Sequence, residues 1–224
     1  MTSASQEDYL RAIYELTVNS PQGTASVTTN LLAARLSVAA PSVTGMIRKL
    51  AEAGLVRHAP YQGVELTRRG ERAALDMVRR HRLLEVFLVR VLDYAWDEVH
   101  EEAHRLEHAV SGLFIERVAA ILGQPESDPH GEPIPTADGH IAAVARRSVL
   151  DMETGSSGQI VQVTDENSSF LRYLDELGLR PGTLIRLVER APFEGPLKLQ
   201  VGDREAVIGP AVASQVRVEP VRRR

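Results

Sequence analysis

The chain has 224 residues, a formal net charge of −4 and no cysteine, and 43% of its residues are hydrophobic. This composition is typical of a globular protein with two or three domains, and it excludes a disulfide framework. No apolar run approaches the ~20 residues that a helix needs to cross a bilayer, and the N-terminus has no signal-peptide pattern, so we expect a cytoplasmic protein without a membrane partner. Any bound metal ion must have nitrogen and oxygen ligands.

The charge is distributed unevenly along the chain. Residues 35–72 contain seven Lys or Arg and only three Asp or Glu, although the whole chain is acidic. A local basic patch can attract the phosphates of nucleic acid, because the field near the patch governs the contact. The patch does not identify a function by itself, since many solvated surfaces are equally basic.

Three helical patterns occupy the first part of the chain. Apolar residues at helical spacing predict a helix over 6–18 and a short helix over 31–36. A third helix begins near Pro41, a residue suited to the first helical turn, and ends at Gly54. The second and third helices therefore form a candidate helix-turn-helix.

Two short strands are predicted next, over 55–58 and 64–67, around a turn at 60–63. Two helices, a hairpin and a following helix together indicate a winged helix-turn-helix, whose second helix enters the major groove of DNA. A small α+β unit that binds no DNA has the same elements, but their order and the basic window favour double-stranded operator DNA. The residues expected to contact base edges or thymine methyls are Pro41, Ser42, Val43 and Thr44, and those expected to contact phosphates or sugars are Thr29, Arg48, Lys49, Arg57 and Tyr61.

A long helix is predicted from Thr67 to about Leu92, followed by helices around 100–108 and over 113–122. The long helix exceeds what a winged-helix domain needs, so we expect it to lead into a helical second domain. The apolar surface of these helices suits an intramolecular core or a dimer interface. Because helix-turn-helix proteins usually bind two half-sites as two-fold dimers, we expect a homodimer.

The last third of the chain changes to a strand pattern. One helix over 168–177 and five short strands suggest a small, partly closed β-barrel, so the fold class is mainly α with a small β part. The strands are predicted over 159–163, 184–188, 197–201, 206–208 and 216–218. The predicted domains are a winged helix-turn-helix (1–72), a helical metal-binding and dimerisation domain (73–140), a linker (141–152) and the small β-barrel (153–224).

The strongest chemical signal is a group of imidazoles and carboxylates on one predicted helix. At about 100° per residue, positions 100, 104, 107 and 108 fall on one helix face. A single helical histidine is more often exposed or hydrogen-bonded than a ligand, but two clustered sets favour a site for a divalent transition metal. The residues on this face are His100, His104, Glu107 and His108, and His81 and Glu85 form the second set, one helical turn apart.

Several motifs together resemble the diphtheria toxin repressor family, the iron- or manganese-activated transcriptional repressors of bacteria. The resemblance covers nearly the full length, and the motifs occur in the order of the family. The segment Leu177–Thr183 is similar to the FeoA-like small barrel that longer members carry. The other motifs are Asp8–Leu16, Arg80–Glu85, Val99–His108 and Pro129–Pro135.

The resemblance implies two metal sites and no catalytic water or small-molecule substrate. One ion held between the first helix and the later dimerisation helix would fix the angle between the two domains. Because the ion binds the competent arrangement better, it would shift the population towards the DNA-binding state. The regulatory site falls on Asp8, His104, Glu107 and His108, and the ancillary site on His81, Glu85 and His100, with Glu166 as a ligand from the barrel.

The residues at the matched positions bear on the identity of the metal. Iron-responsive members have methionine in place of Asp8 and cysteine in place of His104, whereas manganese-responsive members have aspartate at the first and usually a carboxylate at the second. Histidine at position 104 matches neither pattern, and Arg11 stands where some manganese-responsive members have another glutamate. We expect Mn²⁺, with Fe²⁺ as the close alternative, and binding of Zn²⁺, Co²⁺ or Cd²⁺ in vitro.

Two other function classes stay open at this point. Glu101–His104 is a Glu-x-x-His pattern of the kind found in carboxylate-bridged di-iron enzymes, but such a bundle needs a second pattern from another helix, which the sequence lacks. A metal-independent DNA binder with a peptide-binding barrel is the other class. We expect a metal-activated regulator and no enzyme, and a titration of operator binding with metal separates the three.

Overall fold

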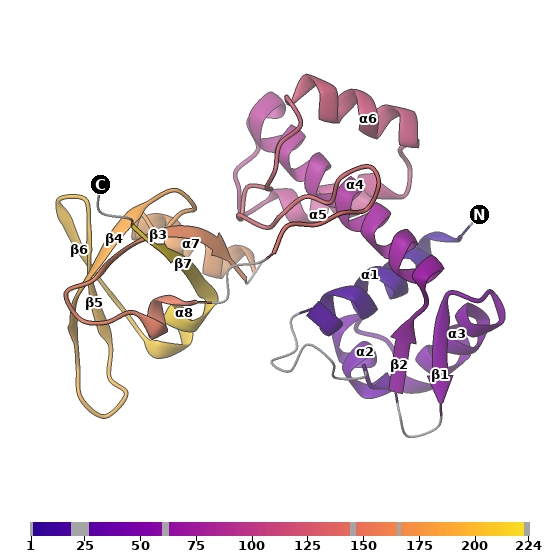
Figure 1. Cartoon of the computed structure of the whole chain (residues 1–224), viewed down its shortest axis with the longest axis horizontal. Helices are drawn as coiled ribbons and strands as arrows, with labels where there is room; N and C mark the ends of the chain where they lie inside the picture. Colours follow the sequence, from indigo (N-terminus) through magenta and orange to yellow (C-terminus); the bar gives the residue numbers. More distant parts are fainter. Residues whose placement is uncertain (1, 19–26, 60–62, 144–146, 165–166, 222–224) are drawn as a thin grey trace. The chain divides into compact units, whose positions relative to one another are not determined.

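Three helices and a two-stranded hairpin form the N-terminal part of the computed structural model (Figure 1). The helices are α1 (Ala4–Val18), α2 (Thr29–Arg35) and α3 (Ala40–Glu52), and the antiparallel strands are β1 (Val56–Ala59) and β2 (Gly63–Leu66). This order of elements confirms the predicted winged helix-turn-helix. The structure describes residues 2–18, 27–59, 63–143, 147–164 and 167–221.

Local signals set the ends of these helices. The Thr28 hydroxyl caps α2 by accepting a hydrogen bond from the Leu31 N–H at 3.2 Å. Pro41 lies in the first turn of α3, where its missing N–H costs no helical bond. Gly54 follows α3 with a φ of +69°, a conformation that glycine adopts without strain. The helices bury their apolar faces, and the side chains with 0 or 1% exposure are Leu10, Ile13, Leu32, Val43, Ile47 and Leu50.

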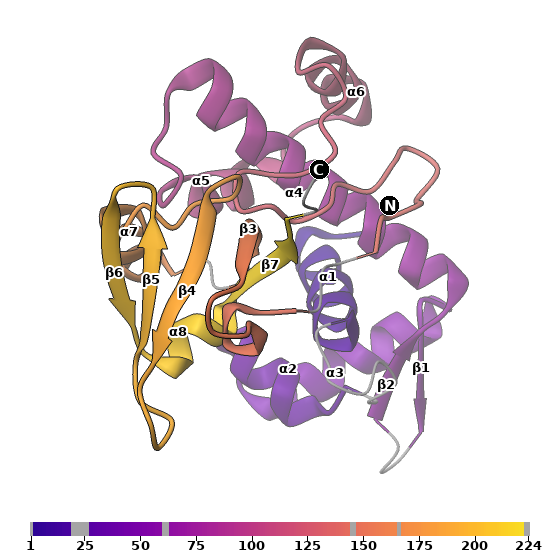
Figure 2. The ribbon, with the colours of Figure 1, turned by 60° about the vertical axis from the view of Figure 1, so that its left-hand side comes forward.

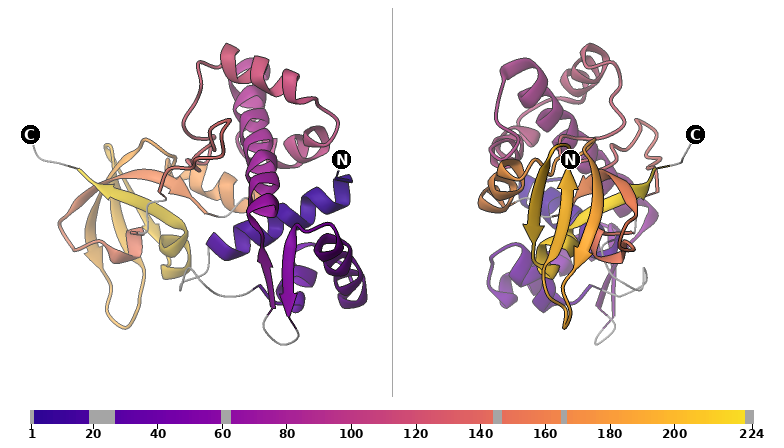
Figure 3. Two further views of the ribbon diagram at one scale, coloured as in Figure 1. Left: turned by 45° about the vertical axis from the view of Figure 1, so that its right-hand side comes forward. Right: turned by 90° about the vertical axis from the view of Figure 1, so that its left-hand side faces the viewer.

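Three further helices follow, and their ends lie within one residue of those predicted. They are α4 (Arg68–Leu92), α5 (Val99–Glu107) and α6 (Gly112–Ile121). The chain divides into two compact units, and the division falls inside α4, after His81. Among the described residues, no helix is both long and apolar enough to span a membrane. In the second unit, the last part of α4 lies beside α5 and α6 (Figure 3). The buried side chains that these helices share include Leu83, Leu84, Leu88, Val99, Ala103, Ile115 and Val118.

The last third of the chain contains a five-stranded antiparallel sheet with the strand order β6-β5-β4-β3-β7 (Figure 2). Bulges at Ile160–Gln162 and Leu187–Glu189 interrupt the register, and bulges of this kind bend a strand. The curved sheet encloses an apolar core, which confirms the predicted small barrel. The strands are β3 (Ser157–Val163), β4 (Leu184–Arg190), β5 (Leu197–Val201), β6 (Arg204–Ile208) and β7 (Val216–Pro220), with the helices α7 (Ser168–Glu176) and α8 (Pro210–Gln215).

The segment expected to be a linker differs from the prediction at its C-terminal end. A short 3-10 helix, η1 (Val149–Asp151), lies there, and the side chains of Val149 and Met152 are buried in the barrel core. Ser148 caps this turn together with Asp151. The helix α8, which begins at Pro210, was also not predicted. The η1 turn has only two buried apolar residues, Val149 and Met152, which are too few to show helical periodicity in the sequence.

The barrel packs closely against a loop of the helical part within the second unit. The Val163 N–H of β3 donates to the His130 carbonyl at 2.8 Å. Gly131 has a φ of +87°, and a Cβ at this position would lie 1.9 Å from the Val161 carbonyl oxygen. Only glycine therefore allows the loop to approach β3 this closely.

Candidate metal centres and DNA-binding surface

Three potential metal ligands meet at the C-terminal end of α5, and we call them the α5 cluster: His104, Glu107 and His108. The Glu107 side chain is fully buried, and its Oε1 lies 2.8 Å from His104 Nδ1 and 3.5 Å from His108 Nε2. The two imidazole rings stand edge to face with their centroids 5.7 Å apart. Residues three and four positions apart on a helix are neighbours, so one turn of α5 and its cap bring the three side chains together.

The α5 cluster has the donors and the access that a metal site needs. Two imidazole nitrogens and a carboxylate oxygen suit Mn²⁺, Fe²⁺ and Zn²⁺. The His104 side chain is 46% exposed, so an ion can reach the buried Glu107 carboxylate from solvent. Burying a carboxylate is costly unless it is paired, and a bound cation would offset that cost.

Asp8, the fourth predicted ligand of the regulatory site, lies on α1 in the first unit and is half-buried. Its neighbours Tyr9 and Leu10 are buried in the N-terminal core, so the helix that carries Asp8 is anchored. Burial raises the pKa of the Tyr9 phenol. Asp8 is thus a carboxylate on a firmly packed helix of the DNA-binding part.

A second group of donors lies in the second unit, where α4, α5 and the loop around residue 130 meet. We call it the Glu85 cluster: Glu85, His100, Asp128 and His130. The Glu85 side chain is fully buried, with Oε1 3.3 Å from His100 Nδ1 and Oε2 3.9 Å from His130 Nδ1. One ligand atom from each of Glu85, Asp128 and His130 lies within 4.8 Å of the other two. His81 is buried one turn before Glu85 on α4.

The hydrogen bonds of His130 fit a cation in the Glu85 cluster. Its Nε2 lies 2.8 Å from the Trp96 carbonyl oxygen, and because a carbonyl only accepts, Nε2 carries the proton. In the neutral imidazole, Nδ1 then carries a lone pair. The Nδ1 atom is buried and has no hydrogen-bond partner among the described residues. The Glu85 Oε2 atom lies 3.9 Å from Nδ1, so a cation between the two atoms would interact favourably with both. Histidines that bind metal usually donate the other ring N–H to a carbonyl or carboxylate in this way.

Asp128 is oriented by the backbone of its own loop. Its Oδ1 accepts the N–H groups of His130 and Glu132, each at 2.9 Å, and its Oδ2 lies 3.7 Å from Arg82 Nε. The loop therefore presents a carboxylate and an imidazole side by side from residues 128 and 130. Sequence reasoning missed both as ligands, although they lie in or next to the motif Pro129–Pro135, because a loop has no period that predicts where its side chains point.

The predicted site residues have different outcomes. The structure brings together His104, Glu107 and His108, and it places His100 against Glu85. Glu166, the predicted ligand from the barrel, lies outside the described residues.

Most of the predicted DNA contacts lie exposed on the helix-turn-helix. On α3, Ser42, Thr44 and Arg48 are exposed, and Arg48 pairs with Glu52 one turn later at 2.9 Å. Both partners of this pair are well exposed, so phosphate can displace the pair at little cost. Pro41, Lys49 and Arg57 are also exposed, Thr29 is half-buried, and Tyr61 lies outside the described residues.

The prediction for Val43 is wrong. Its side chain is 0% exposed and belongs to the buried face of α3, so it cannot contact a thymine methyl. The residue lies in the first turn of the recognition helix, but the rotation of α3 on the core turns this position inward.

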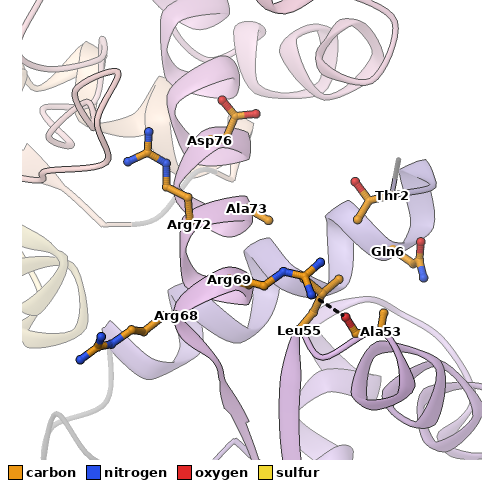
Figure 4. A pocket seen from close by; sticks show the side chains of 9 residues that line it. All are labelled: Thr2, Gln6, Ala53, Leu55, Arg68, Arg69, Arg72, Ala73 and Asp76. Carbon is orange, nitrogen blue, oxygen red and sulfur yellow. Dashed lines mark hydrogen bonds between the residues drawn. The ribbon is translucent and has the colours of Figure 1, made fainter.

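A cavity of about 730 Å³ lies in the first unit near the start of α4, and three arginines are among the residues that line it (Figure 4). Two of its arginines hold neighbouring loops: Arg69 Nη1 donates to the Ala53 carbonyl at 3.4 Å and Arg72 Nη2 to the Ala137 carbonyl at 2.6 Å. These arginines therefore connect neighbouring segments of the first unit and also give the cavity positive charge. Its lining consists of Thr2, Gln6, Ala53, Leu55, Arg68, Arg69, Arg72, Ala73 and Asp76.

Comparisons with known families cover almost the whole chain. The family model for the iron dependent repressor N-terminal DNA binding domain matches residues 1–64, that for the iron dependent repressor metal binding and dimerisation domain matches residues 67–136, and the FeoA domain matches residues 147–220. The iron-dependent repressor IdeR of Mycobacterium leprae is 29% identical over 227 residues, which cover 96% of each chain.

Solved structures are similar over the full length as well. A manganese-dependent transcriptional repressor in complex with manganese is 40% identical with a TM-score of 0.88, covering 96% of this chain and 100% of that one. The manganese regulator SloR is 34% identical with a TM-score of 0.77, covering 98% and 100%. The three family matches, their order and this similarity agree with the winged helix, the metal-ligand clusters and the barrel. The chain therefore belongs to the diphtheria toxin repressor family of metal-dependent transcriptional repressors.

Proposed function

We propose that the protein is a metal-activated transcriptional repressor that binds operator DNA as a homodimer when an ion occupies a site formed by Asp8 and the α5 cluster. The observation that carries the proposal is the buried Glu107 carboxylate with an imidazole on either side, in a chain that also has a winged helix-turn-helix. The carboxylate and imidazole donors would coordinate the ion, which would supply the positive charge that they lack.

The ligands of this site come from two different units of the chain, and this explains how the ion would act. Asp8 belongs to the first unit and the α5 cluster to the second. An ion bound by both restricts how the DNA-binding part is held, so it stabilises one arrangement over others. The ion activates DNA binding to the extent that its affinity differs between these arrangements.

Manganese is the proposed effector, with ferrous iron as the alternative. All donors of the α5 cluster and Asp8 are oxygen or imidazole nitrogen, and the chain has no cysteine. Carboxylate ligands suit Mn²⁺, while imidazole suits several transition metals. Two of the similar proteins are described as manganese-dependent or manganese regulators, and IdeR as iron-dependent.

Dimerisation is supported by apolar side chains that the single chain leaves exposed in its helical part. Leu113 is 70% exposed and Ile121 73%, and Leu92 at the end of α4 is 51% exposed. Burial of such side chains in a two-fold interface would place two recognition helices on two half-sites.

The proposal is tested by titrating metal-free protein with Mn²⁺, Fe²⁺, Co²⁺ and Zn²⁺ while operator binding is measured by fluorescence anisotropy. We expect operator binding to require metal. We expect Asp8→Ala to abolish activation by metal, because the one ligand that the first unit contributes to the set of four is lost while the fold is kept. Asp76→Ala on α4, also a carboxylate of the first unit, is the matched control.

Two outcomes would refute the proposal. Operator binding that is equally tight without metal would favour a metal-independent DNA binder. A folded Asp8→Ala variant with full metal activation would show that the ion does not act through the first unit.

A further inference from the structure

We propose that Trp96 is a positioning residue for the Glu85 cluster: by anchoring in the barrel, it holds His130 in the orientation that binds an ion. The inference rests on a metal ion binding at the Glu85 cluster, which shares Glu85 and His100 with the predicted ancillary site. It links two features that lie in the same unit, a buried set of ligands and the docking of the barrel.

Trp96 belongs to the connection between α4 and α5, yet its side chain is part of the barrel core. It is 4% exposed and packs in the same cluster as Leu171, Leu174 and Leu179. The Arg180 guanidinium lies over the indole ring, 5.0 Å from its centroid. Next to it, the Asp97 carboxylate accepts a hydrogen bond from Arg172 of α7 at 3.0 Å. The connection is thus fastened to the barrel by an apolar anchor and an ion pair.

The same tryptophan determines the tautomer of His130. Its backbone carbonyl accepts the proton of His130 Nε2, and its ring lies 5.6 Å from the imidazole at an angle of 31°. On the other side, Val163 of β3 donates to the His130 carbonyl. The imidazole is therefore held between two elements that depend on the barrel, with Nδ1 directed towards Glu85.

Thermodynamic linkage follows from this arrangement. If barrel docking holds His130 in the ligating orientation, an undocked barrel lowers the affinity for the ion. The bound ion must then stabilise the docked barrel by the same free energy. A hydrogen-bond partner behind a metal-binding histidine typically changes metal affinity by about 10- to 100-fold.

The experiment uses the full-length protein with Glu107→Gln, so that binding of Mn²⁺ or Co²⁺ at the Glu85 cluster is observed without the α5 cluster. In this background we compare Trp96→Ala with Trp96→Phe by calorimetry with Mn²⁺. Trp96→Ala keeps the backbone carbonyl but removes the anchor that holds this carbonyl against His130, so we expect it to weaken binding by about 10-fold or more. Trp96→Phe should restore binding to within about 3-fold, because phenylalanine keeps the apolar anchor.

The visible absorption of bound Co²⁺ separates a positioning role from a merely structural one. Loss of His130 from the coordination sphere changes this spectrum, so the spectrum of Trp96→Ala should approach that of His130→Ala. If Trp96 only stabilised the barrel and did not position His130, the spectrum would stay that of the parent protein. Trp96 is the one tryptophan of the chain, so its fluorescence should also respond to Mn²⁺ with the midpoint that calorimetry gives for Mn²⁺, and this response should be absent in His130→Ala.

A folded Trp96→Ala variant with the affinity and the Co²⁺ spectrum of its parent would overturn the proposal. If that variant does not fold, Asp97→Asn loosens the same connection from Arg172, and an unchanged affinity and spectrum there would overturn it equally. Absence of any ion at the Glu85 cluster would overturn both this inference and the ancillary site. The role of the α5 cluster in DNA binding would still depend on its own test.

Discussion

The two ligand clusters of the second unit are built in different ways. The α5 cluster comes from five consecutive positions of one helix and its cap, and His104 is 46% exposed. The Glu85 cluster comes from α4, α5 and a loop, and Glu85, Asp128 and His130 are all buried. An ion can exchange more readily at the α5 cluster, because in the Glu85 cluster only His100, at 25%, has an exposed part. We therefore propose that the α5 cluster senses the ion and that the Glu85 cluster stabilises the structure.

The largest expected effect is on the α5 cluster. Glu107→Gln should reduce metal-activated operator affinity by about 100-fold, because the carboxylate that faces both imidazoles is lost. The measurement is anisotropy of a labelled operator at fixed salt with saturating Mn²⁺. Glu101→Gln is the control, since this carboxylate of the same helix is 77% exposed and faces Arg105. Equal effects of the two substitutions would contradict the assignment.

The buried cluster should respond differently. His130→Ala should lower the number of bound ions by one per chain and remove the part of the metal-induced stabilisation that arises there, about 2.7 kcal/mol at a metal concentration 100 times Kd. Operator affinity at saturating metal should change by less than about 5-fold. Calorimetry and thermal unfolding with and without Mn²⁺ measure these quantities, and exposed His140→Ala is the control. Loss of DNA binding as severe as in Glu107→Gln would remove the distinction between the clusters.

A smaller effect is expected on the DNA-binding surface. Arg48→Ala should weaken binding to every sequence alike by several-fold, and it should reduce the slope of log K against log salt by about 0.9, because one phosphate contact is lost. Lys198→Ala on β5 of the barrel removes the same charge far from the recognition helix in sequence. A loss confined to one base position would show that Arg48 contacts a base instead.

The smallest effect concerns the turn that begins the barrel. The Ser148 N–H and hydroxyl donate to Asp151 Oδ2 at 2.8 and 2.7 Å, and these hydrogen bonds lower the pKa of the Asp151 carboxyl. Asp151→Asn should therefore cost about 1 kcal/mol of unfolding free energy at pH 7. Because the pKa is lower in the folded state, the stabilisation is complete above the ordinary value of 3.8 and is lost as the pH falls below it.

Urea unfolding at pH 7 and near pH 3 checks this sign. The difference between wild type and Asp151→Asn should shrink in acid, and exposed Asp203→Asn should show no such difference at either pH. A difference that grows in acid would contradict the hydrogen-bonded carboxylate.

Elements in which apolar residues repeat regularly were predictable from the sequence. The helices α4, α5 and α6 lie within one residue of the predicted ends, because apolar residues repeat along them at helical spacing. The α5 cluster was predictable for the same reason, since its ligands lie on one turn of one helix. The strands of the barrel were recognisable from short apolar runs between turns, although η1 and α8 were too short to leave a pattern.

Sequence periodicity does not predict where some side chains lie, and only the tertiary structure decides their position. Asp128 and His130 reach Glu85 only because the loop folds back between α4 and the barrel, and no spacing along the chain encodes that approach. Val43 is buried because packing determines which face of α3 turns inward, and a count of residues from the helix start cannot predict it. Trp96 joins the core of a domain that begins some fifty residues later. Helical spacing thus determined the local ligands, whereas long-range packing decided which distant side chains complete the buried site.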